Sequence, residues 1–331
     1  MSIALEIPYY LPPMSQSFAD RLLAAIDAKG SPICVGIDPM VEMVPDDVTA
    51  GRHKQSPDNL PICLDAIFEF SMTILKRVAP LVPAVKFQSA YFERYLWDGV
   101  EAYYSLIQEA REMGLIVIGD IKRGDIGSTS AAYAKGHLAE PSFDDMEEVL
   151  VPDAVTVNPM LGIDAIQPFI DTAREYDKGL FVLVRTSNPG SAELQDVKLA
   201  DGRTWSEMLA DRVAQIADQP AFVGSAGYSA IGAVVGATQT HTIQSMRQRM
   251  PKSIFLLPGY GTQGATADMT RAAFDANGRG ALVAASRSIL YAHRDPALRA
   301  RHGDDWEACV TAAVHAMRDD LAKVLHRPAQ G

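Results

Sequence analysis

Charged residues are concentrated just after one apolar run of the chain. Residues 119–129, GDIKRGDIGST, include Asp120, Lys122, Arg123 and Asp125, and they follow the apolar residues LIVI. An unpaired charge at the end of a buried strand is costly, so this cluster needs either paired partners or a chemical task. Carboxylate and ammonium groups placed side by side can transfer protons or stabilise charge that develops on a substrate.

Strand periodicity places two of these residues on one face. Residues two apart in a strand point the same way, so Asp120 and Lys122 are expected to face the interior together. Lys86 lies in AVKFQ and Asp38 closes VGID, both in other apolar runs. We expect these four residues to form a ring of alternating charge at one mouth of a barrel. A structural ion pair between Asp120 and Lys122, and a Lys86 side chain that extends to solvent, remain as alternatives.

Asp125 lies beyond the strand, where strand periodicity cannot place it. Its residue type, just before the helix expected to begin near residue 126, also suits a helix cap that accepts a hydrogen bond from an orphan backbone N–H group. The residues alone leave open whether Asp125 is a cap or a functional carboxylate.

Two further segments indicate a site for an anionic group. Residues 258–264, PGYGTQG, begin at Pro258 and contain Gln263, and their glycines allow backbone N–H groups to converge on one ligand. Arg287, in ASRSI, stands at the expected start of a helix, where the dipole also favours negative charge. Together they predict a phosphate site, and the alternative is two tight turns beside a surface arginine.

Two long connections follow expected strands. Residues 40–60 are rich in Pro, Asp, Gly and Lys, and residues 187–212 separate the fifth strand from its helix. The second connection opens with RTSNPGS, in which Ser187 and Asn188 offer hydrogen bonds beside a Pro-Gly turn. Because barrel active sites form at the carboxyl ends of strands, both connections are candidate lids.

Eight short apolar runs alternate with amphipathic stretches, and this order predicts the fold. Most runs are continuous, which is typical of strands buried on both faces. The expected strands are 33–38, 84–88, 115–122, 154–158, 180–186, 233–238, 254–259 and 281–286. Helical periodicity occurs at 64–78 and at 100–114, where Gly114 is the expected C-cap. We predict one (β/α)8 TIM barrel domain over residues 1–331, with peripheral N-terminal and C-terminal segments; a doubly wound sheet is the alternative.

Composition limits the classes of function. The chain has 331 residues, 48% of them hydrophobic, and a formal net charge of −11, which argues against nucleic acid or an acidic membrane surface as a partner. Three scattered cysteines and seven histidines show no disulfide or zinc-site spacing. No secretory signal and no apolar run of about 18–20 residues occurs, so we expect a cytoplasmic protein without a membrane span.

With these residues identified, the chain resembles the orotidine 5′-phosphate decarboxylase family in its long bacterial form. The resemblance rests on a D-x-K-x-x-D-I-x-x-T pattern, a lysine and an aspartate on earlier strands, an S-x-P-G turn, a P-G-x-G-x-Q-G loop and an arginine in R-S-I. The matching residues are Asp38, Lys86, Asp120, Lys122, Asp125, Ile126, Thr129, Ser187, Pro189, Gly190, residues 258–264 and Arg287. These motifs occur in family order from residue 33 to about residue 290.

The resemblance implies a decarboxylase that needs no metal and no organic cofactor. Lys122 would stabilise the carbanion left at C6 of orotidine 5′-phosphate and then protonate it to give UMP. Asp120 would lie beside the departing carboxylate, either repelling it or orienting Lys122, and Lys86 would hold Asp120 and the ribose hydroxyls. Implied substrate-binding residues are Asp38 for the ribose, Thr129 for the nucleotide, Ser187 for the pyrimidine, and Pro258, Gln263 and Arg287 for the phosphate.

The resemblance also implies a homodimer with shared active sites. In the family, the counterpart of Asp125 reaches into the neighbouring subunit's site and completes an alternating Lys-Asp-Lys-Asp array. The connections at 40–60 and 187–212 match no family motif, apart from the S-x-P-G turn that contains Ser187. No other residue of the two connections is therefore assigned a role.

Two other functions remain as alternatives. A 3-keto-gulonate-phosphate decarboxylase or a hexulose-phosphate synthase shares the D-x-K-x-x-D pattern, but it uses Mg²⁺ and an enediolate. The S-x-P-G turn and the PGYGTQG loop favour the nucleotide enzyme over these relatives. A non-catalytic barrel that binds phosphorylated metabolites is the second alternative, and the set formed by Lys86, Asp120 and Lys122 argues against it.

Overall fold

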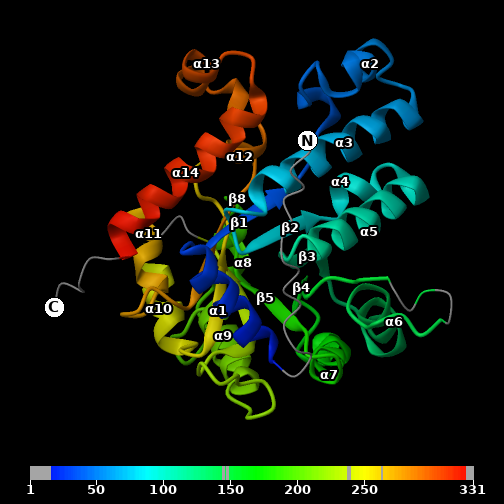
Figure 1. Ribbon diagram of the computed structural model, residues 1–331. Helices are drawn as coiled ribbons and strands as arrows, with labels where there is room; N and C mark the ends of the chain where they lie inside the picture. Colours follow the sequence, from blue (N-terminus) through cyan, green and yellow to red (C-terminus); the bar gives the residue numbers. More distant parts are fainter. Residues whose placement is uncertain (1–15, 144–145, 147–148, 237–239, 262–263, 326–331) are drawn as a thin grey trace.

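Eight parallel strands form one closed barrel in the computed structural model, which describes residues 16–143, 146, 149–236, 240–261 and 264–325 (Figure 1). The strands are β1 Ile33–Ile37, β2 Ala84–Gln88, β3 Ile116–Arg123, β4 Ala154–Val157, β5 Gly179–Arg185, β6 Ser229–Val235, β7 Ser253–Leu257 and β8 Ala281–Ala285. Neighbours in sequence are neighbours in the barrel, and β8 pairs with β1. The predicted (β/α)8 barrel is confirmed, and the doubly wound sheet is excluded.

Helices follow the strands and form the outer layer, as Figure 1 shows, except α1, which precedes β1. They are α1 Phe18–Lys29, α2 Arg52–Gln55, α3 Leu60–Val78, α4 Ala90–Glu93, α5 Leu96–Glu112, α6 Gly127–His137, α7 Gln167–Glu175, α8 Ser191–Gln195, α9 Trp205–Ala217, α10 Thr240–Arg249, α11 Ala267–Thr270, α12 Arg287–Leu290, α13 Pro296–His302 and α14 Trp306–Leu325. The stretches predicted at 64–78 and 100–114 lie in α3 and α5. The C-cap of α5 is Met113, and the predicted Gly114 (φ 79°) is the residue after it, where its N–H donates to the carbonyl of Arg111 at 2.9 Å.

Side chains of the strands alternate between two apolar clusters. On β1, Val35 packs outward with the helices, whereas Cys34 faces inward with residues of other strands such as Ile118 and Leu256. The inward-facing cluster also contains the apolar face of α1. The barrel is therefore a packed core rather than a pore, and polar residues on inward positions near the strand ends come close together.

Helix α1 covers the end of the barrel at which the strands begin. The ring of Phe18 packs edge-on against Phe181 with 6.1 Å between ring centroids. A Cβ on Gly179 would lie 2.2 Å from Cδ1 of Phe18, so only glycine fits at the start of β5. Asp20 accepts hydrogen bonds from the N–H groups of Ser225 (2.8 Å) and Ala226 (2.9 Å), just before β6. These contacts fix α1 and leave the opposite end of the barrel for the charged residues.

Two predicted boundaries were wrong. Strand β6 begins at Ser229, whereas the predicted strand began at residue 233. The first half of β6 was missed because small residues that are weak strand formers occupy it. Gly232 is needed there, since a Cβ would lie 2.5 Å from the carbonyl oxygen of Ile254. Helix α9 begins at Trp205 rather than after residue 212, because Thr204 and Glu207 form a reciprocal capping box. The connection after β5 is correspondingly shorter.

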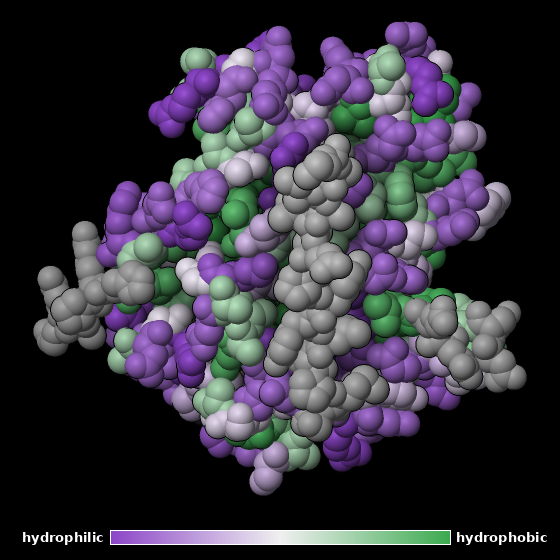
Figure 2. Space-filling view, viewed as in Figure 1, coloured by the Kyte–Doolittle hydropathy of each residue, from purple (hydrophilic) through white to green (hydrophobic). Residues whose placement is uncertain are grey.

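The surface of the described residues is mainly polar. Figure 2 shows hydrophilic residues over most of the visible face, with hydrophobic residues in small patches between them. In the part of the chain that the structure describes, no helix has the length and apolar character that crossing a bilayer requires.

We expect Phe18→Ala to lower the free energy of unfolding by about 3–5 kcal/mol, because it removes a fully buried ring from the closed end of the barrel. Urea unfolding measures this change. Phe143→Ala is the matched control, because Phe143 is exposed and its loss is expected to change stability by less than about 0.5 kcal/mol. A loss below about 1 kcal/mol in Phe18→Ala would show that α1 does not stabilise the barrel.

Candidate active site

The carboxylate of Asp120 accepts four hydrogen bonds at the carboxyl end of the barrel. Its Oδ1 accepts from the Lys122 ammonium at 2.6 Å and from the Thr156 hydroxyl at 2.8 Å. Its Oδ2 accepts from the Lys86 ammonium at 2.9 Å and from the Gln88 amide at 3.1 Å. A carboxylate offers about four acceptor positions, so Asp120 is fully used and fixed in orientation.

The parallel register of the strands brings these groups together. Gln88 of β2 pairs with Asp120 of β3, so the inward-facing side chains at this level come from adjacent strands. Lys86, two residues earlier, also lies 3.6 Å from Oδ1 of Asp38, which follows β1. Lys86 and Asp120 are 8% and 6% exposed. The predicted ring of Asp38, Lys86, Asp120 and Lys122 is thus present, and Lys86 is inside the barrel rather than extended to solvent.

Electrostatic pairing keeps both buried partners charged. Burial alone would raise the pKa of Asp120, but the charges of Lys86 and Lys122 outweigh it and lower that pKa well below its usual range. Burial alone would lower the pKa of Lys86, but the charges of Asp120 and Asp38 raise it instead. One layer deeper, burial raises the pKa of the Cys34 thiol to about 12, so this cysteine is not a nucleophile.

Lys122 has an unusual backbone conformation. Its φ is 49°, in the left-handed region, which costs a non-glycine residue about 1–2 kcal/mol. The pairing of β3 with β4 shifts between Gly119 and Arg123. The two-residue periodicity therefore predicted the contact of Lys122 with Asp120 correctly. The backbone that makes this contact is nevertheless not that of a regular strand. Its side chain is 44% exposed at the mouth of the barrel, where a ligand can reach it.

Asp125 and Thr129 lie outside this cluster. Asp125 accepts a hydrogen bond from the N–H of the next residue, Ile126, at 2.7 Å. The N-cap of α6 is Ile126, with no side-chain cap bond, so the helix-cap alternative that the residues left open for Asp125 does not hold. Thr129 is exposed on the first turn of α6. Among the described residues Asp125 has no cationic partner, so one chain alone does not bring it to Lys122.

The segments predicted to bind phosphate lie next to each other. Pro258 and Gly259 follow β7, and Arg287 opens α12 directly after β8. A Cβ on Gly261 would lie 3.5 Å from Oγ of Ser288, so the glycine loop and α12 are in contact. Arg287 is exposed. Gln263 lies outside the described residues.

The start of the connection after β5 is fixed to the barrel. The guanidinium of Arg185, at the end of β5, contacts Asp196 through two hydrogen bonds of 3.1 and 3.0 Å and also donates to Ser191. These bonds anchor helix α8 to the strand end. Ser187, between them, packs against Gly236 just after β6. The predicted Ser187 therefore lies at the mouth, on a connection that carries its own helix.

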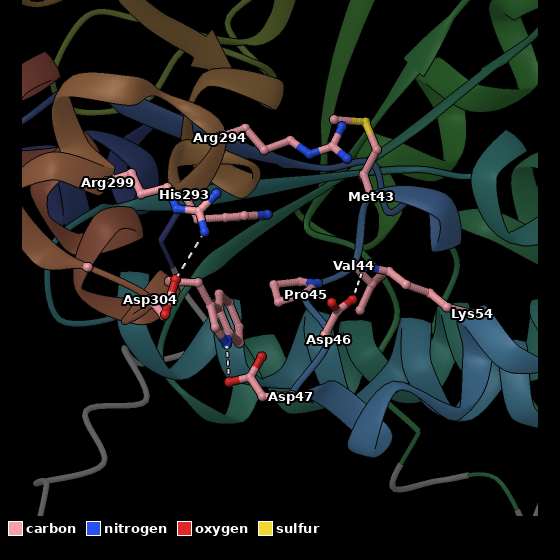
Figure 3. A pocket seen from close by; sticks show the side chains of 12 residues that line it. Met43, Val44, Pro45, Asp46, Asp47, Lys54, His293, Arg294, Arg299 and Asp304 are labelled. Atoms are coloured by element: carbon pink, nitrogen blue, oxygen red, sulfur yellow. Dashed lines mark hydrogen bonds and ion pairs between the residues drawn. The ribbon is translucent and has the colours of Figure 1, made fainter.

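A separate cavity of about 540 Å³ contains none of the predicted site residues (Figure 3). It is formed between the connection after β1 and the segment after β8. Its carboxylates are used within its own walls: Asp47 accepts from the indole of Trp306 at 3.0 Å, and Asp304 pairs with Arg299 at 3.1 Å. Tyr291, which precedes the cavity-lining His293, donates its hydroxyl to the carbonyl of Asp38.

Thr156 and Gln88 are the contacts of Asp120 that the sequence reasoning missed. Both carried a signal, because each is a polar residue on an inward position of an apolar strand. The same two-residue spacing that paired Asp120 with Lys122 links Lys86 to Gln88. Among the described residues, no group of three or more His, Cys, Asp and Glu side chains is arranged to hold a metal ion.

The fold is a closed parallel barrel, and ion-paired lysine and aspartate side chains lie at the carboxyl ends of its strands. These two features define a class of protein, the (β/α)8-barrel enzymes whose active site acts through charged side chains. Residues 31–302 match the model of the Orotidine 5′-phosphate decarboxylase / HUMPS family. The chain belongs to this family. It is an enzyme, a carbon–carbon lyase.

Similar proteins cover nearly the whole chain. The orotidine 5′-phosphate decarboxylase of Rhodopirellula baltica is 41% identical over 308 residues, which are 92% of this chain and 99% of that protein. The enzyme of the same name from Caldicellulosiruptor saccharolyticus is 40% identical over 84% of this chain and 91% of its own. A solved structure from Streptomyces avermitilis, described as a candidate orotidine 5′-phosphate decarboxylase, has a TM-score of 0.75 and 32% identity, and the match covers 96% of this chain and 99% of that chain.

We expect the wild type to be more stable than an Asp120→Asn variant. The difference in their free energies of unfolding should be constant from about pH 5 to 9. The lowered pKa of Asp120 means that its ionised form stabilises the folded state above the unfolded pKa, about 3.9, and that this contribution is lost as the pH falls through the folded pKa. The raised pKa of Lys86 places the corresponding alkaline loss above about pH 10.

The measurement is the difference in melting temperature between the two proteins at each pH. A difference that stays flat from pH 6 to pH 3 would contradict the assignment of Asp120 as a buried, ion-paired carboxylate.

Proposed function

We propose that this enzyme decarboxylates orotidine 5′-phosphate to UMP, the last step of de novo pyrimidine nucleotide synthesis, as a cytoplasmic homodimer that needs no metal or cofactor. The observation that carries the proposal is the Lys86–Asp120–Lys122 network, with one ammonium exposed at the mouth of the barrel. The name and high coverage of the Rhodopirellula baltica relative support the substrate.

Lys122 is proposed to stabilise and then protonate the reacting carbon. When the bond between C6 and the carboxylate breaks, CO2 leaves and the electron pair stays on C6. A proton then passes from the Lys122 ammonium to C6, which gives UMP and a neutral amine that water reprotonates. The 2.6 Å contact with Asp120 supports this role, because it fixes the ammonium before the substrate arrives.

A single lysine is too weak to account for the whole effect. Two opposite charges about 4 Å apart interact by roughly 4 kcal/mol at an effective dielectric of about 20. Enzymes commonly lower barriers by about 8–23 kcal/mol, so the remainder must come from binding elsewhere on the substrate. Asp38 and Lys86 are proposed to bind the ribose, and Ser187 the pyrimidine. Pro258, Gln263 and Arg287 are assigned to the phosphate.

The four hydrogen bonds of Asp120 favour an orienting role for this carboxylate. Both oxygens of Asp120 are saturated by donors from three strands. Two of these donors, Lys86 and Lys122, are cations that screen the charge of the carboxylate. Repulsion of a substrate carboxylate by such a neutralised group is weak. Asp120 therefore acts mainly by holding Lys122 and Lys86 in place.

Exposed apolar residues support the homodimer. Trp97, Ile126 and Leu161 are large, exposed hydrophobic residues that follow β2, β3 and β4, three neighbouring strands of the barrel. Apolar groups gathered beside an active site are typical of protein interfaces. Asp125 and Thr129 lie in the same region, so a second copy bound there would bring Asp125 toward the site that its own chain does not reach.

The alternative within the family is an Mg²⁺-dependent decarboxylase or synthase acting on a sugar phosphate. The Ser187-Pro189-Gly190 turn and the glycine loop at 258–264 favour the nucleotide enzyme. A non-catalytic phosphate-binding barrel is disfavoured because Lys86, Asp120 and Lys122 are assembled as one network.

We expect chelator-treated wild-type protein to convert orotidine 5′-phosphate to UMP, followed as the loss of substrate absorbance. Lys122→Ala should lower kcat by at least about 10³-fold, because it removes both the stabilising charge and the proton donor. Lys135→Ala is the control, an exposed lysine on α6 whose loss should leave kcat unchanged. Activity lost with EDTA and restored by Mg²⁺ would favour the sugar-phosphate enzyme, and absence of any decarboxylation would overturn the proposal.

For the shared site, we expect a mixture of inactive Asp125→Asn and Lys122→Ala proteins to regain activity after subunit exchange. In each hybrid dimer one site carries both defects and the other carries neither, so random mixing gives about a quarter of wild-type activity. Exchange is confirmed by native mass spectrometry with one protein isotope-labelled. Hybrid dimers without restored activity would show that Asp125 does not act across the interface.

A further inference from the structure

Thr156 lies at the one point where strands β3 and β4 lose their regular pairing. Gly119 pairs with Val155 and Arg123 with Val157, so three residues of β3, Asp120 to Lys122, face the single residue Thr156. The side chain of Thr156 is buried, with only 1% of the residue exposed. A side chain at such a bulge can take over hydrogen bonds that the strand ladder cannot make.

The hydroxyl of Thr156 forms both of its hydrogen bonds within this bulge. It accepts the backbone N–H of Lys122 at 3.0 Å and donates to Oδ1 of Asp120 at 2.8 Å. The directions of these bonds are fixed, because a backbone N–H can only donate and a carboxylate can only accept. One hydroxyl therefore ties the backbone of Lys122 to the carboxylate that holds its own ammonium.

These contacts close a ring around the reacting lysine. Thr156 holds the left-handed backbone of Lys122 at its N–H. Oδ1 of Asp120 holds the ammonium of Lys122 at 2.6 Å, and Thr156 donates to the same Oδ1. Removing the hydroxyl leaves a buried N–H without a partner at a strained residue. We therefore expect the backbone of Lys122 to change conformation without this hydroxyl, and its ammonium to move with it.

We propose that Thr156 is a positioning residue, whose hydroxyl sets the place of the Lys122 ammonium by holding both Lys122 and Asp120. It does not touch the substrate. This inference rests on the proposed function for its kinetic test, and it also predicts a property of the free enzyme that does not depend on the substrate.

The kinetic test compares Thr156→Val, which keeps the shape and removes the hydroxyl, with Thr156→Ser, which keeps the hydroxyl. We expect the valine variant to lower kcat by about 10- to 100-fold with KM within about threefold of wild type, since only the placement of the proton donor changes. The serine variant should stay within about threefold of wild-type kcat. Thr270→Val is the matched control, because it removes a buried hydroxyl that donates only to the carbonyl of Ala267.

The second measurement needs no substrate. Lys122 in the free enzyme is labelled with acetic anhydride and quantified by peptide mass spectrometry, with the exposed Lys135 as the internal reference. We expect Lys122 to be labelled faster in Thr156→Val than in wild type, because its ammonium is no longer held against Asp120. Wild-type and Thr270→Val proteins should label alike. If the wild type does not decarboxylate orotidine 5′-phosphate, this labelling comparison still decides whether Thr156 positions Lys122.

Two outcomes would overturn the proposal. A folded Thr156→Val protein with wild-type kcat and wild-type labelling would show that the hydroxyl positions nothing. A Thr156→Ser protein as impaired as the valine variant would show that the methyl group, not the hydroxyl, matters. If the valine variant does not fold, Thr156→Cys replaces it, because a thiol keeps the size and donates only weakly, and the same results then decide.

Discussion

The buried carboxylate of Asp120 is the constraint on which the site depends. A carboxylate placed inside a barrel must be compensated by donors that the surrounding strands supply. Here β2 supplies Lys86 and Gln88, β3 supplies Lys122, and β4 supplies Thr156. Because each donor comes from a strand fixed by hydrogen bonds on both sides, the cluster is rigid before any substrate binds, which electrostatic catalysis requires.

The site combines this rigidity with an irregularity in the pairing of β3 with β4. Strands β2 and β3 pair in register along their length, which places inward-facing residues of equal height side by side. The shift between β3 and β4 then turns Lys122 out of the strand path while its ammonium returns to Asp120. A regular strand would place Lys122 inside the core, whereas the bulge leaves its ammonium both paired and reachable from the mouth.

Strand periodicity and apolar patterning were enough to predict the barrel and the pairing of Asp120 with Lys122, because both follow from residue type and a two-residue repeat. They could not predict the contact of Thr156 with Asp120. That contact depends on the register between β3 and β4, which is set by the closed barrel. The early start of β6 was missed because its first half contains Gly232, a weak strand former that close packing against Ile254 and Phe181 requires. No cationic partner of Asp125 could be predicted from the sequence, because none lies in its own chain among the described residues.

Helix α1 gives the order of synthesis a structural meaning. The helix precedes every strand of the barrel in the chain, yet Asp20 bonds to Ser225, 205 residues later, and Phe18 packs on β5. The nascent chain therefore keeps an amphipathic helix uncovered until the sixth strand has been made. Contacts this distant in sequence slow folding, and they leave apolar surface open to association in the meantime. The segment that seals the finished barrel is thus the one whose protection during synthesis matters most.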